Sequence, residues 1–413
     1  MKNSGSFWLA ATSLCALVAL ATFDLGTHLV SAAGAPLESS SGPYRVLAPL
    51  ESGNLLLFPV VRAEDKSPGE TPFITLDEGI RSGDVEVTEA GRVQGLVRPR
   101  RPAPPSPEPP QDRGDEVNTL VLVNHSAKPL LLLAGEIVTG GKQDRVIAKD
   151  RIVPVGADPI DLSVFCIEPG RWTEDSPTFG AAAKSTARGF MVQPTIRERA
   201  MVQKDQQQVW DSVHGAINQM EMASAPHPTM PANGGVQNSL PVPRSIATTS
   251  YARVMQDSAV SEKVDEAAAP AIKARDQVLA ELRQEHAVGV VVAVRGEIVW
   301  ADLFADTDLL SRYWTKLVRS YAAESLAEGE TLSAPSLADA QHFLDAPSSG
   351  SESSQGDVGV YRYRELKSVK TETFILESLL PGTGYNVHIS KMKLISSSTE
   401  RPKPHLPIYR PIY

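Results

Sequence analysis

The order in which strand-like and helix-like apolar patterns follow one another constrains the fold of this 413-residue chain most. Short apolar runs between turn residues, typical of β-strands, fill the stretches before residue 170 and after residue 357. Between residues 194 and 344, apolar residues recur mostly at helical spacings of three and four. This order predicts an α+β fold rather than alternating βαβ units. We expect a β-rich core of buried strands and hairpins, with a segment of several helices between two strand-rich regions.

The first strand-rich region contains two strands around a Ser52-Gly53-Asn54 turn and, further on, several continuous apolar runs. Such runs are typical of strands that are buried on both faces. Strands are expected within 44–61, 84–89, 118–123, 129–133, 145–155 and 160–167, with a short helix at 75–80 and a second turn at Gly140-Gly141.

The longest helical pattern covers residues 194–222, and Thr195 is placed to cap this helix. Its apolar stripe consists of Trp210, Val213, Ile217 and Met220. Further helices are expected at 251–286 with a break at Pro270, from a cap at Asp306 or Thr307 to about residue 326, and at 336–344. The clearest hairpin is 288–294 with 298–304 around Arg295-Gly296, residues 348–356 are expected to form a loop, and strands return at 358–393.

The 32 prolines gather largely in segments that cannot form regular ladders. We therefore expect a single α+β domain over residues 43–395, with a Pro-rich insert at 97–111, a loop at 224–244 and a Pro-rich tail at 396–413. The insert should adopt extended polyproline II. It serves either as a surface spacer or as a docking peptide for an aromatic groove.

Residues 1–33 have the pattern of a signal peptide. An apolar stretch at 7–23 is followed by small residues, which favours cleavage after Ala33. An uncleaved anchor and a lipid on Cys15 are the alternatives. We expect an exported protein, periplasmic or extracellular, which stays at the membrane if the signal is not removed. The mature chain would keep one cysteine, Cys166, and no apolar window long enough for a membrane span, so no internal disulfide is expected.

Composition and spacing give no support to two classes of function. Lys and Arg total 40 against 49 Asp and Glu, a formal net charge of −9, whereas a general nucleic-acid binder needs a basic face. The histidines and cysteines form no H-E-x-x-H, C-x-x-C or paired-histidine spacing. We therefore expect no nucleic-acid partner, no metal site and no cofactor.

The densest polar cluster follows the run at 129–133 and contains Glu136, Lys142, Gln143 and Arg145 around Gly140-Gly141. Glycines before a lysine resemble a phosphate cradle, because they let backbone N–H groups point at an anion. The spacing fails as a P-loop, since Gly141 stands where the lysine belongs and Gln143 where a hydroxyl residue belongs. The alternative is a β-turn with a charged tip.

A second cluster closes the strand at 160–167 and contains Cys166, Glu168, Arg171 and Trp172. Cys166 is either a nucleophile, which would require a histidine such as His125 or His388, or a small buried hydrophobe. Arg171 with Trp172 either grips an anion and stacks on a ring, or forms a corner with an ion pair to Glu168.

Four segments carry a family resemblance: LLLLAGEIVTGGKQDR (130–145), VPVGADPIDLSVFCIEPGRW (153–172), VGVVVAVRGEIVWADLF (288–304) with the Trp-containing helix after it, and the strand end Val387-His388-Ile389-Ser390. In this order they resemble the ARG and Rhodanese-Phosphatase-superfamily-associated protein domain, an uncharacterised bacterial family. The resemblance covers residues 43–395. It implies a shared domain and does not imply an enzyme.

These features leave three hypotheses for function. The first is an exported domain that binds an anionic or nucleotide-like ligand, or a partner protein, through Lys142, Gln143, Arg145, Arg171 and Trp172, provided that the two turns converge. The second is a hydrolase or transferase for a phosphorylated or ADP-ribose-like substrate, with Glu136 or Glu168 as acid/base and Cys166 and His388 as further candidates. The third is a structural envelope protein with Pro-rich docking arms.

Overall fold

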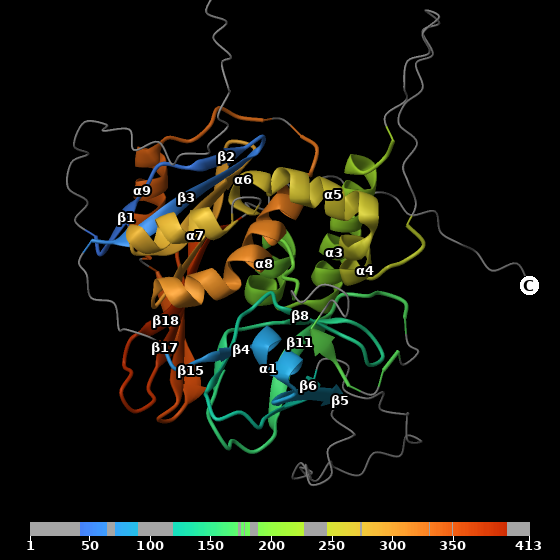
Figure 1. The fold of residues 1–413 in the computed structure, drawn as a ribbon, viewed down its shortest axis with the longest axis vertical. Helices are drawn as coiled ribbons and strands as arrows, with labels where there is room; N and C mark the ends of the chain where they lie inside the picture. The colour runs from blue at the N-terminus through green and yellow to red at the C-terminus, as the bar shows by residue number, and fades with distance from the viewer. Residues whose placement is uncertain are drawn as a thin grey trace, which may run out of the picture.

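The computed structural model describes residues 42–63, 71–89, 119–171, 175–176, 178–181, 189–226, 246–272, 275–329, 331–348 and 350–394. Figure 1 shows helices above a smaller β region and beside a larger sheet, which confirms the expected β-rich α+β fold. The predicted signal 1–33, insert 97–111, residues 227–244 and tail 396–413 lie outside the described residues. Within the described ranges, no helix has both the length and the apolarity to cross a bilayer.

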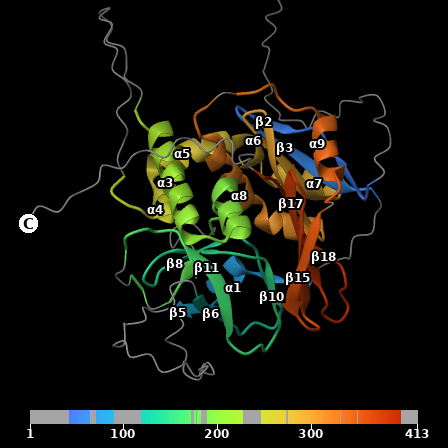
Figure 2. The same cartoon turned by 180° about the vertical axis from the view of Figure 1, so that it is seen from behind.

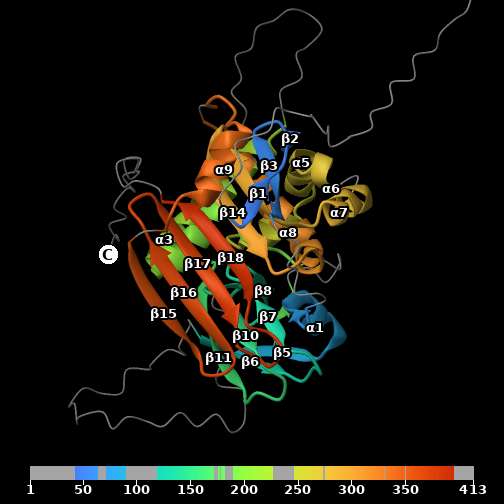
Figure 3. The same cartoon turned by 90° about the vertical axis from the view of Figure 1, so that its left-hand side faces the viewer.

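One antiparallel sheet of nine strands joins the first and last parts of the described chain (Figure 3). Its order is β1-β3-β13-β14-β18-β17-β16-β15, with β2 paired to β3. The strands are β1 (Tyr44–Val46), β2 (Leu50–Ser52), β3 (Leu55–Arg62), β13 (Ala287–Val294), β14 (Glu297–Phe304), β15 (Ser351–Asp357), β16 (Tyr361–Lys367), β17 (Thr371–Ser378) and β18 (Asn386–Lys393). The predicted hairpin lies inside this sheet, and its turn residues Arg295 and Gly296 have φ of 51° and 81°, as a type I′ turn requires.

Strand β13 is buried along its whole length because both faces of the sheet are covered. Successive side chains of a strand point to opposite faces. Val290 therefore joins the main core under helix α8 (Thr307–Ser325), and Val291 joins a second core under helix α9 (Leu337–Asp345). Helix α8 begins as predicted, with the Asp306 carboxylate accepting a hydrogen bond from the Leu309 N–H at 2.7 Å.

The smaller β region consists of a six-stranded sheet, β12-β8-β9-β11-β6-β5, and a three-stranded sheet, β10-β7-β4. Its elements are β4 (Ile74–Thr75), α1 (Leu76–Ser82), β5 (Val85–Glu89), β6 (Thr119–Asn124), β7 (Leu130–Leu132), β8 (Ile137–Thr139), β9 (Arg145–Ile147), β10 (Arg151–Val153), β11 (Ile160–Cys166) and β12 (Gly180–Ala181). The predicted short helix is α1, which Thr75 and Glu78 cap reciprocally.

The prediction of one uninterrupted helix over 194–222 is wrong. The segment forms α2 (Pro194–Glu198), one π-helical turn (Arg199–Gln203) and α3 (Gln206–Ala223). The break falls at Lys204, whose φ is 53°, and Asp205 then starts α3 by accepting a hydrogen bond from the Gln208 N–H.

Two details of that prediction also change. Thr195 does not cap α2, because its hydroxyl donates a hydrogen bond to Glu324 at 2.5 Å. Val209 is fully buried in the apolar stripe of α3, whereas Trp210 is only half-buried.

The predicted helical segment 251–286 forms four pieces. They are α4 (Tyr251–Gln256), α5 (Ser258–Ala267), α6 (Ala269–Ile272) and α7 (Arg275–Gln284). The break near Pro270 is confirmed, and Asp257 makes an additional break with an extended ψ of 134° while its side chain caps α5.

The prediction of a loop at 348–356 is wrong, because β15 forms an edge strand there. It pairs with β16 from Ser351 to Asp357, although nearly all of its side chains are exposed. Backbone hydrogen bonds to a neighbouring strand, rather than an apolar pattern, determine this strand, so its Ser/Gly-rich sequence did not reveal it.

A single cluster of buried apolar side chains contains residues of the large sheet, the smaller β region and the helices. Leu131 and Ile152 enter it from the smaller region, Trp300 from β14, and Tyr313 and Trp314 from α8. The views of Figures 1 and 2 agree that most of the helices lie above the smaller β region and beside the large sheet.

Close backbone approach inside the central hairpin should make Gly289 intolerant of a side chain. A Cβ at this position would lie 2.4 Å from the Asp302 carbonyl oxygen and 2.8 Å from the Leu303 Cα. We expect Gly289→Ala to lower the free energy of unfolding by about 1–3 kcal/mol, measured by urea denaturation. The matched control is Gly215→Ala in α3, where the added methyl meets open space. The free energy of unfolding of the Gly215→Ala variant should rise by up to about 1 kcal/mol. Equal changes in the free energy of unfolding for the two variants would contradict the packing argument.

Candidate functional site

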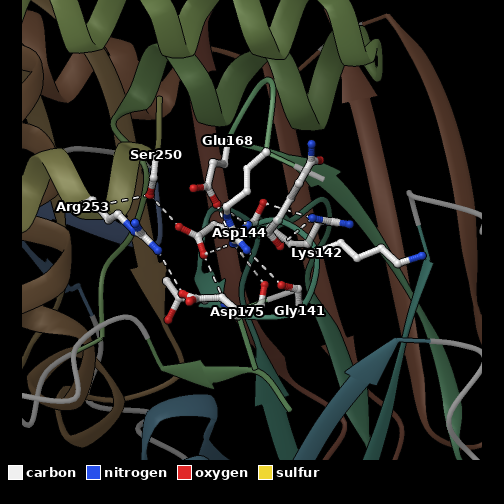
Figure 4. Close-up of polar contacts among 12 residues, drawn as sticks. Gly141, Lys142, Asp144, Glu168, Asp175, Ser250 and Arg253 are labelled. Carbon is white, nitrogen blue, oxygen red and sulfur yellow. Dashed lines mark hydrogen bonds and ion pairs between the residues drawn. The ribbon is translucent and has the colours of Figure 1, made fainter. Parts of the chain in front are cut away.

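The two turns predicted to carry the site are in contact (Figure 4). The Arg171 guanidinium donates to the carbonyl oxygens of Gly141 at 3.0 Å and Gly140 at 3.4 Å. It also lies 2.6 Å from the Glu168 carboxylate and 3.6 Å from that of Asp144. Trp172 lies outside the described residues, so its predicted part in this cluster stays a prediction.

The glycine turn has the shape of an anion cradle, but the protein supplies the acceptors. Gly140 and Gly141 have φ of 128° and 50°. The Gly140 N–H donates to the Asp144 carboxylate, the Gly141 N–H to the Ser176 carbonyl oxygen, and the Lys142 N–H to the Glu89 carboxylate, each at 3.1 Å. These N–H groups are therefore already paired with acceptors of the chain itself.

Asp144 is the centre of this cluster. Its second carboxylate oxygen accepts from the Ser250 hydroxyl at 2.6 Å, and its own N–H donates to Glu168 at 3.2 Å. Burial and the negative charge of Glu168 raise the pKa of Asp144. Ser250 also caps α4 by accepting from the Arg253 N–H, and Arg253 pairs with Asp175 at 2.9 Å. The cluster thus ties the turn to α4, which Figure 2 shows above β8 and β11.

The remaining predicted binding residues of the glycine turn point in different directions. The Lys142 side chain extends away from Asp144 (Figure 4). Arg145 is fully buried, donating to the Gln143 carbonyl oxygen at 2.5 Å and lying 3.8 Å from Glu89. Both polar atoms of the Gln143 side-chain amide are buried and have no hydrogen-bond partner within the described part of the chain.

Cys166 has the environment of a buried hydrophobe. It is 1% exposed, and burial raises the pKa of its thiol to about 11. Its backbone N–H and C=O both bond to the Gln206 side chain at 2.9 Å, which fixes the end of β11 against α3. The residue is therefore a thiol near neutral pH, whereas nucleophilic catalysis requires the thiolate.

Glu136 is buried in an ion-pair group rather than in a cleft. Lys316 of α8 lies 2.5 Å from Glu136 and 2.6 Å from Asp77. The other Glu136 oxygen accepts from the Leu133 N–H at 2.7 Å. Burial raises the pKa of Glu136 even though the Lys316 charge lowers it. This group connects α8 and α1 to the start of β8.

His388 lies in a buried network that sequence reasoning did not foresee. Its Nδ1 is 2.6 Å from Asp150, and its Nε2 is 3.2 Å from Asp302. Asp302 also receives two hydrogen bonds from Arg197, at 2.8 and 3.0 Å, and accepts from the Tyr321 hydroxyl. These groups come from β18, the β9–β10 loop, β14, α2 and α8, so the network joins both β regions to the helices.

The charges of this network fix its protonation. Burial alone would lower the pKa of His388, but Asp150 and Asp302 raise it to about 9. Burial opposes ionisation of Asp302 as well, yet Arg197 and His388 hold the pKa of that carboxyl well below its ordinary value. His388 is therefore an imidazolium that is hydrogen-bonded to Asp150 through Nδ1 and lies beside the Asp302 carboxylate through Nε2. An aspartate inside the apolar run IVWADLF (298–304) was the one local signal that could have drawn attention to this network.

Two cavities lie against the large sheet, away from the predicted residues. The first, called the Lys391 cleft, has a volume of about 270 Å³ and lies between α9 and the outer face of β14, β17 and β18. The second, called the arginine cavity, has a volume of about 280 Å³ and lies where β3 and α7 end and α8 begins. Among the residues that the structure places, no group of three or more His, Cys, Asp or Glu suits a metal ion.

The fold and these sites define an α+β domain held together by buried ion pairs, with cavities against its large sheet. The chain belongs to the family described as ARG and Rhodanese-Phosphatase-superfamily-associated Protein domain, ARPP-1, whose family model matches residues 43–392. This confirms the resemblance seen in the sequence. No curated protein and no solved structure matches the chain.

The burial of Cys166 predicts a thiol that reacts only after unfolding. We expect labelling of Cys166 by iodoacetamide at pH 8, followed by peptide mass spectrometry, to be at least about 100-fold slower in native buffer than in urea. A control is Ser163→Cys on the same strand, which places a thiol at an exposed position. That thiol should react in native buffer, and equally fast native labelling of Cys166 would contradict its buried state.

The raised pKa of His388 predicts a pH-dependent contribution to stability. The pKa rises from an ordinary 6.5 to about 9 on folding, so the stabilisation is fully present below pH 6.5 and is lost as pH rises through 9. The difference in the free energy of unfolding between wild type and His388→Gln should therefore narrow by about 3 kcal/mol across this window.

Urea denaturation at several pH values measures this difference. The matched control is His125→Gln, because His125 is exposed, and its difference from wild type should stay flat. A His388→Gln difference that is independent of pH would show that His388 is not held as an imidazolium.

Proposed function

We propose that this protein is an exported domain that binds a small molecule combining an apolar body with an anionic group, and that the Lys391 cleft is its binding site. The pattern of residues 1–33 supports export. The observation that carries the binding proposal is a buried lysine amine in a cleft with mostly apolar walls. A pocket of this kind, with few polar groups and a perturbed pKa, is where small-molecule sites are usually found.

The cleft walls come from the large sheet, the N-terminal strand and α9. The lining residues are Gly42, Pro43, Tyr44, Ala301, Leu303, Leu344, Asp345, Ala346, Ser348, Thr373, Ile375, Ile389 and Lys391. Most of these side chains are apolar, and two of the polar ones, Ser348 and Thr373, bond to each other at 2.8 Å. The walls therefore suit an aliphatic or aromatic group.

Lys391 supplies the charge. The Lys391 side chain is largely buried, since the residue is 5% exposed. Its Nζ donates hydrogen bonds to the carbonyl oxygens of Leu344 at 3.2 Å and Ala346 at 2.5 Å. Burial lowers its pKa to about 8, although the charge of Asp345 raises it, and no carboxylate of the described chain forms an ion pair with it. The amine is thus mostly protonated at pH 7 and has a third N–H for an external acceptor.

A carboxylate ligand would give this buried ammonium group the counter-charge that it lacks. The glycine turn suits an external anion less well, because its N–H groups and Arg171 are paired with the protein's own acceptors. For this reason we place the anionic group of the ligand at Lys391 rather than at Lys142 and Arg145.

Binding of benzoate tests the proposal. We expect benzoate to raise the unfolding temperature in a concentration-dependent manner, whereas the neutral analogue benzamide has a much smaller effect. Lys391→Met should weaken benzoate binding about tenfold or more, because it removes a charge-assisted hydrogen bond. The control is Lys393→Met on the same strand, where the lysine is exposed and pairs with Glu297.

Isothermal titration calorimetry measures both variants, and circular dichroism checks that each is folded. Unchanged benzoate affinity in a folded Lys391→Met variant, or equal binding of benzoate and benzamide, would refute the assignment of Lys391.

A further inference from the structure

The arginine cavity has the opposite character to the Lys391 cleft, because polar and cationic side chains dominate its walls. Arg45, Arg62, His286 and Thr307 line it, together with the carboxylate of Glu285. The two cavities share no lining residue. With His286 neutral, the charged side chains in its lining carry a net charge of +1.

Arg62 is incompletely paired. One guanidinium nitrogen, Nη2, donates to the Ala305 carbonyl oxygen at 3.0 Å. Its Nε is buried and has no hydrogen-bond partner among the residues that the structure describes. A buried N–H without an acceptor costs about 1–3 kcal/mol, so the described chain does not fully satisfy the guanidinium group of Arg62.

No carboxylate neutralises the two arginines within the described part of the chain. Neither Arg45 nor Arg62 forms an ion pair there, in contrast to Arg145, Arg171 and Arg197, which all lie beside carboxylates. Arg62 instead packs over the Tyr44 ring, 5.8 Å from its centroid. The packing of Arg62 on Tyr44 limits where its guanidinium can lie, and an oriented guanidinium loses less entropy on binding.

The start of α8 adds to the positive potential of the cavity. Thr307, which lines the cavity, is the first residue of this 19-residue helix. A helix N-terminus carries a partial positive charge, although the carboxylate of the cap Asp306 offsets part of it. The partial positive charge at the start of α8 therefore adds to the attraction of the two arginines for an anion.

We propose that the arginine cavity binds a tetrahedral oxyanion of the phosphate class, either inorganic phosphate or the phosphate group of a small monoester. Guanidinium groups bind such oxyanions through paired, charge-assisted hydrogen bonds. The two guanidinium groups come from different strands, β1 and β3, and the start of α8 lies at the same cavity, an arrangement that suits a tetrahedral anion better than a planar one. The volume of about 280 Å³ lies at the small end of ligand sites and fits a compact ligand.

Isothermal titration calorimetry of the full chain with inorganic phosphate, in low-salt buffer without other oxyanions, tests the proposal. We expect saturable binding at one site that weakens as chloride is added. Sulfate should compete, glycerol phosphate should bind at the same site, and acetate should bind at least about tenfold more weakly. Absence of saturable phosphate binding, or equal binding of acetate, would overturn the proposal.

Two variants locate the site. Arg62→Gln should weaken phosphate binding about tenfold or more, and Arg45→Gln, at an exposed position, should weaken it several-fold without affecting folding. The matched control is Arg283→Gln, which removes an exposed charge from the end of α7 but does not line the cavity. If Arg62→Gln does not fold, the phosphate affinity of Arg45→Gln alone tests the position of the site. Unchanged affinity in the folded variants, or an equal loss in the control, would place phosphate elsewhere and overturn the proposal.

Discussion

Asp302 is a carboxylate in the middle of the large sheet with no exposure to solvent, and the surrounding structure keeps it charged. The free-energy cost of burying a carboxylate without partners would exceed the net stability of a typical domain. Arg197 and His388 provide the compensation from one helix and one neighbouring strand. Because His388 also reaches Asp150, and Arg197 also donates to the Ala134 carbonyl oxygen at 2.8 Å, the same network holds the smaller β region against the sheet. Removing one partner would leave an uncompensated charge, at a cost of about 3–5 kcal/mol.

The same principle explains the turns at Gly140 and Glu168. Each would look like an anion site if its residues were considered alone, since it offers positive-φ glycines, a lysine and arginines. In the folded chain, Asp144, Glu89 and Glu168 occupy the positions that an external anion would take. The cluster therefore joins β-turns to α4, and the charges of its residues are compensated within the protein.

The two cavities differ because their cations lack such compensation. Lys391 is buried against carbonyl oxygens at the end of α9, and Arg62 keeps a buried N–H without an acceptor. Both lie at places where the large sheet meets a helix end and its faces are incompletely covered. These cavities are open to solvent, whereas the interior network around Asp302 is fully buried.

The sequence predicted correctly those strands, helices and turns whose defining residues lie within a few positions of one another. The hairpin around Arg295-Gly296 and the cap at Asp306 follow from turn chemistry and apolar period alone. The convergence of the turns at 140–145 and 168–171 was a hypothesis whose test required their positions in space. The sequence hid the break at Lys204, because the polar run around it (203–208) contains no glycine or proline to mark a break. It also hid β15, because that strand is defined by its pairing with β16.

Tertiary structure alone decided which charges meet. Asp150 and His388 are 238 residues apart, and Arg197 and Asp302 are 105 apart, so no local pattern links them. Whether an arginine is paired or lines a cavity depends on these distant partners. The sequence by itself therefore determined the fold class, the family and many of the elements. The energetics of burial in the folded chain decided which polar residues hold the structure together and which remain for a ligand.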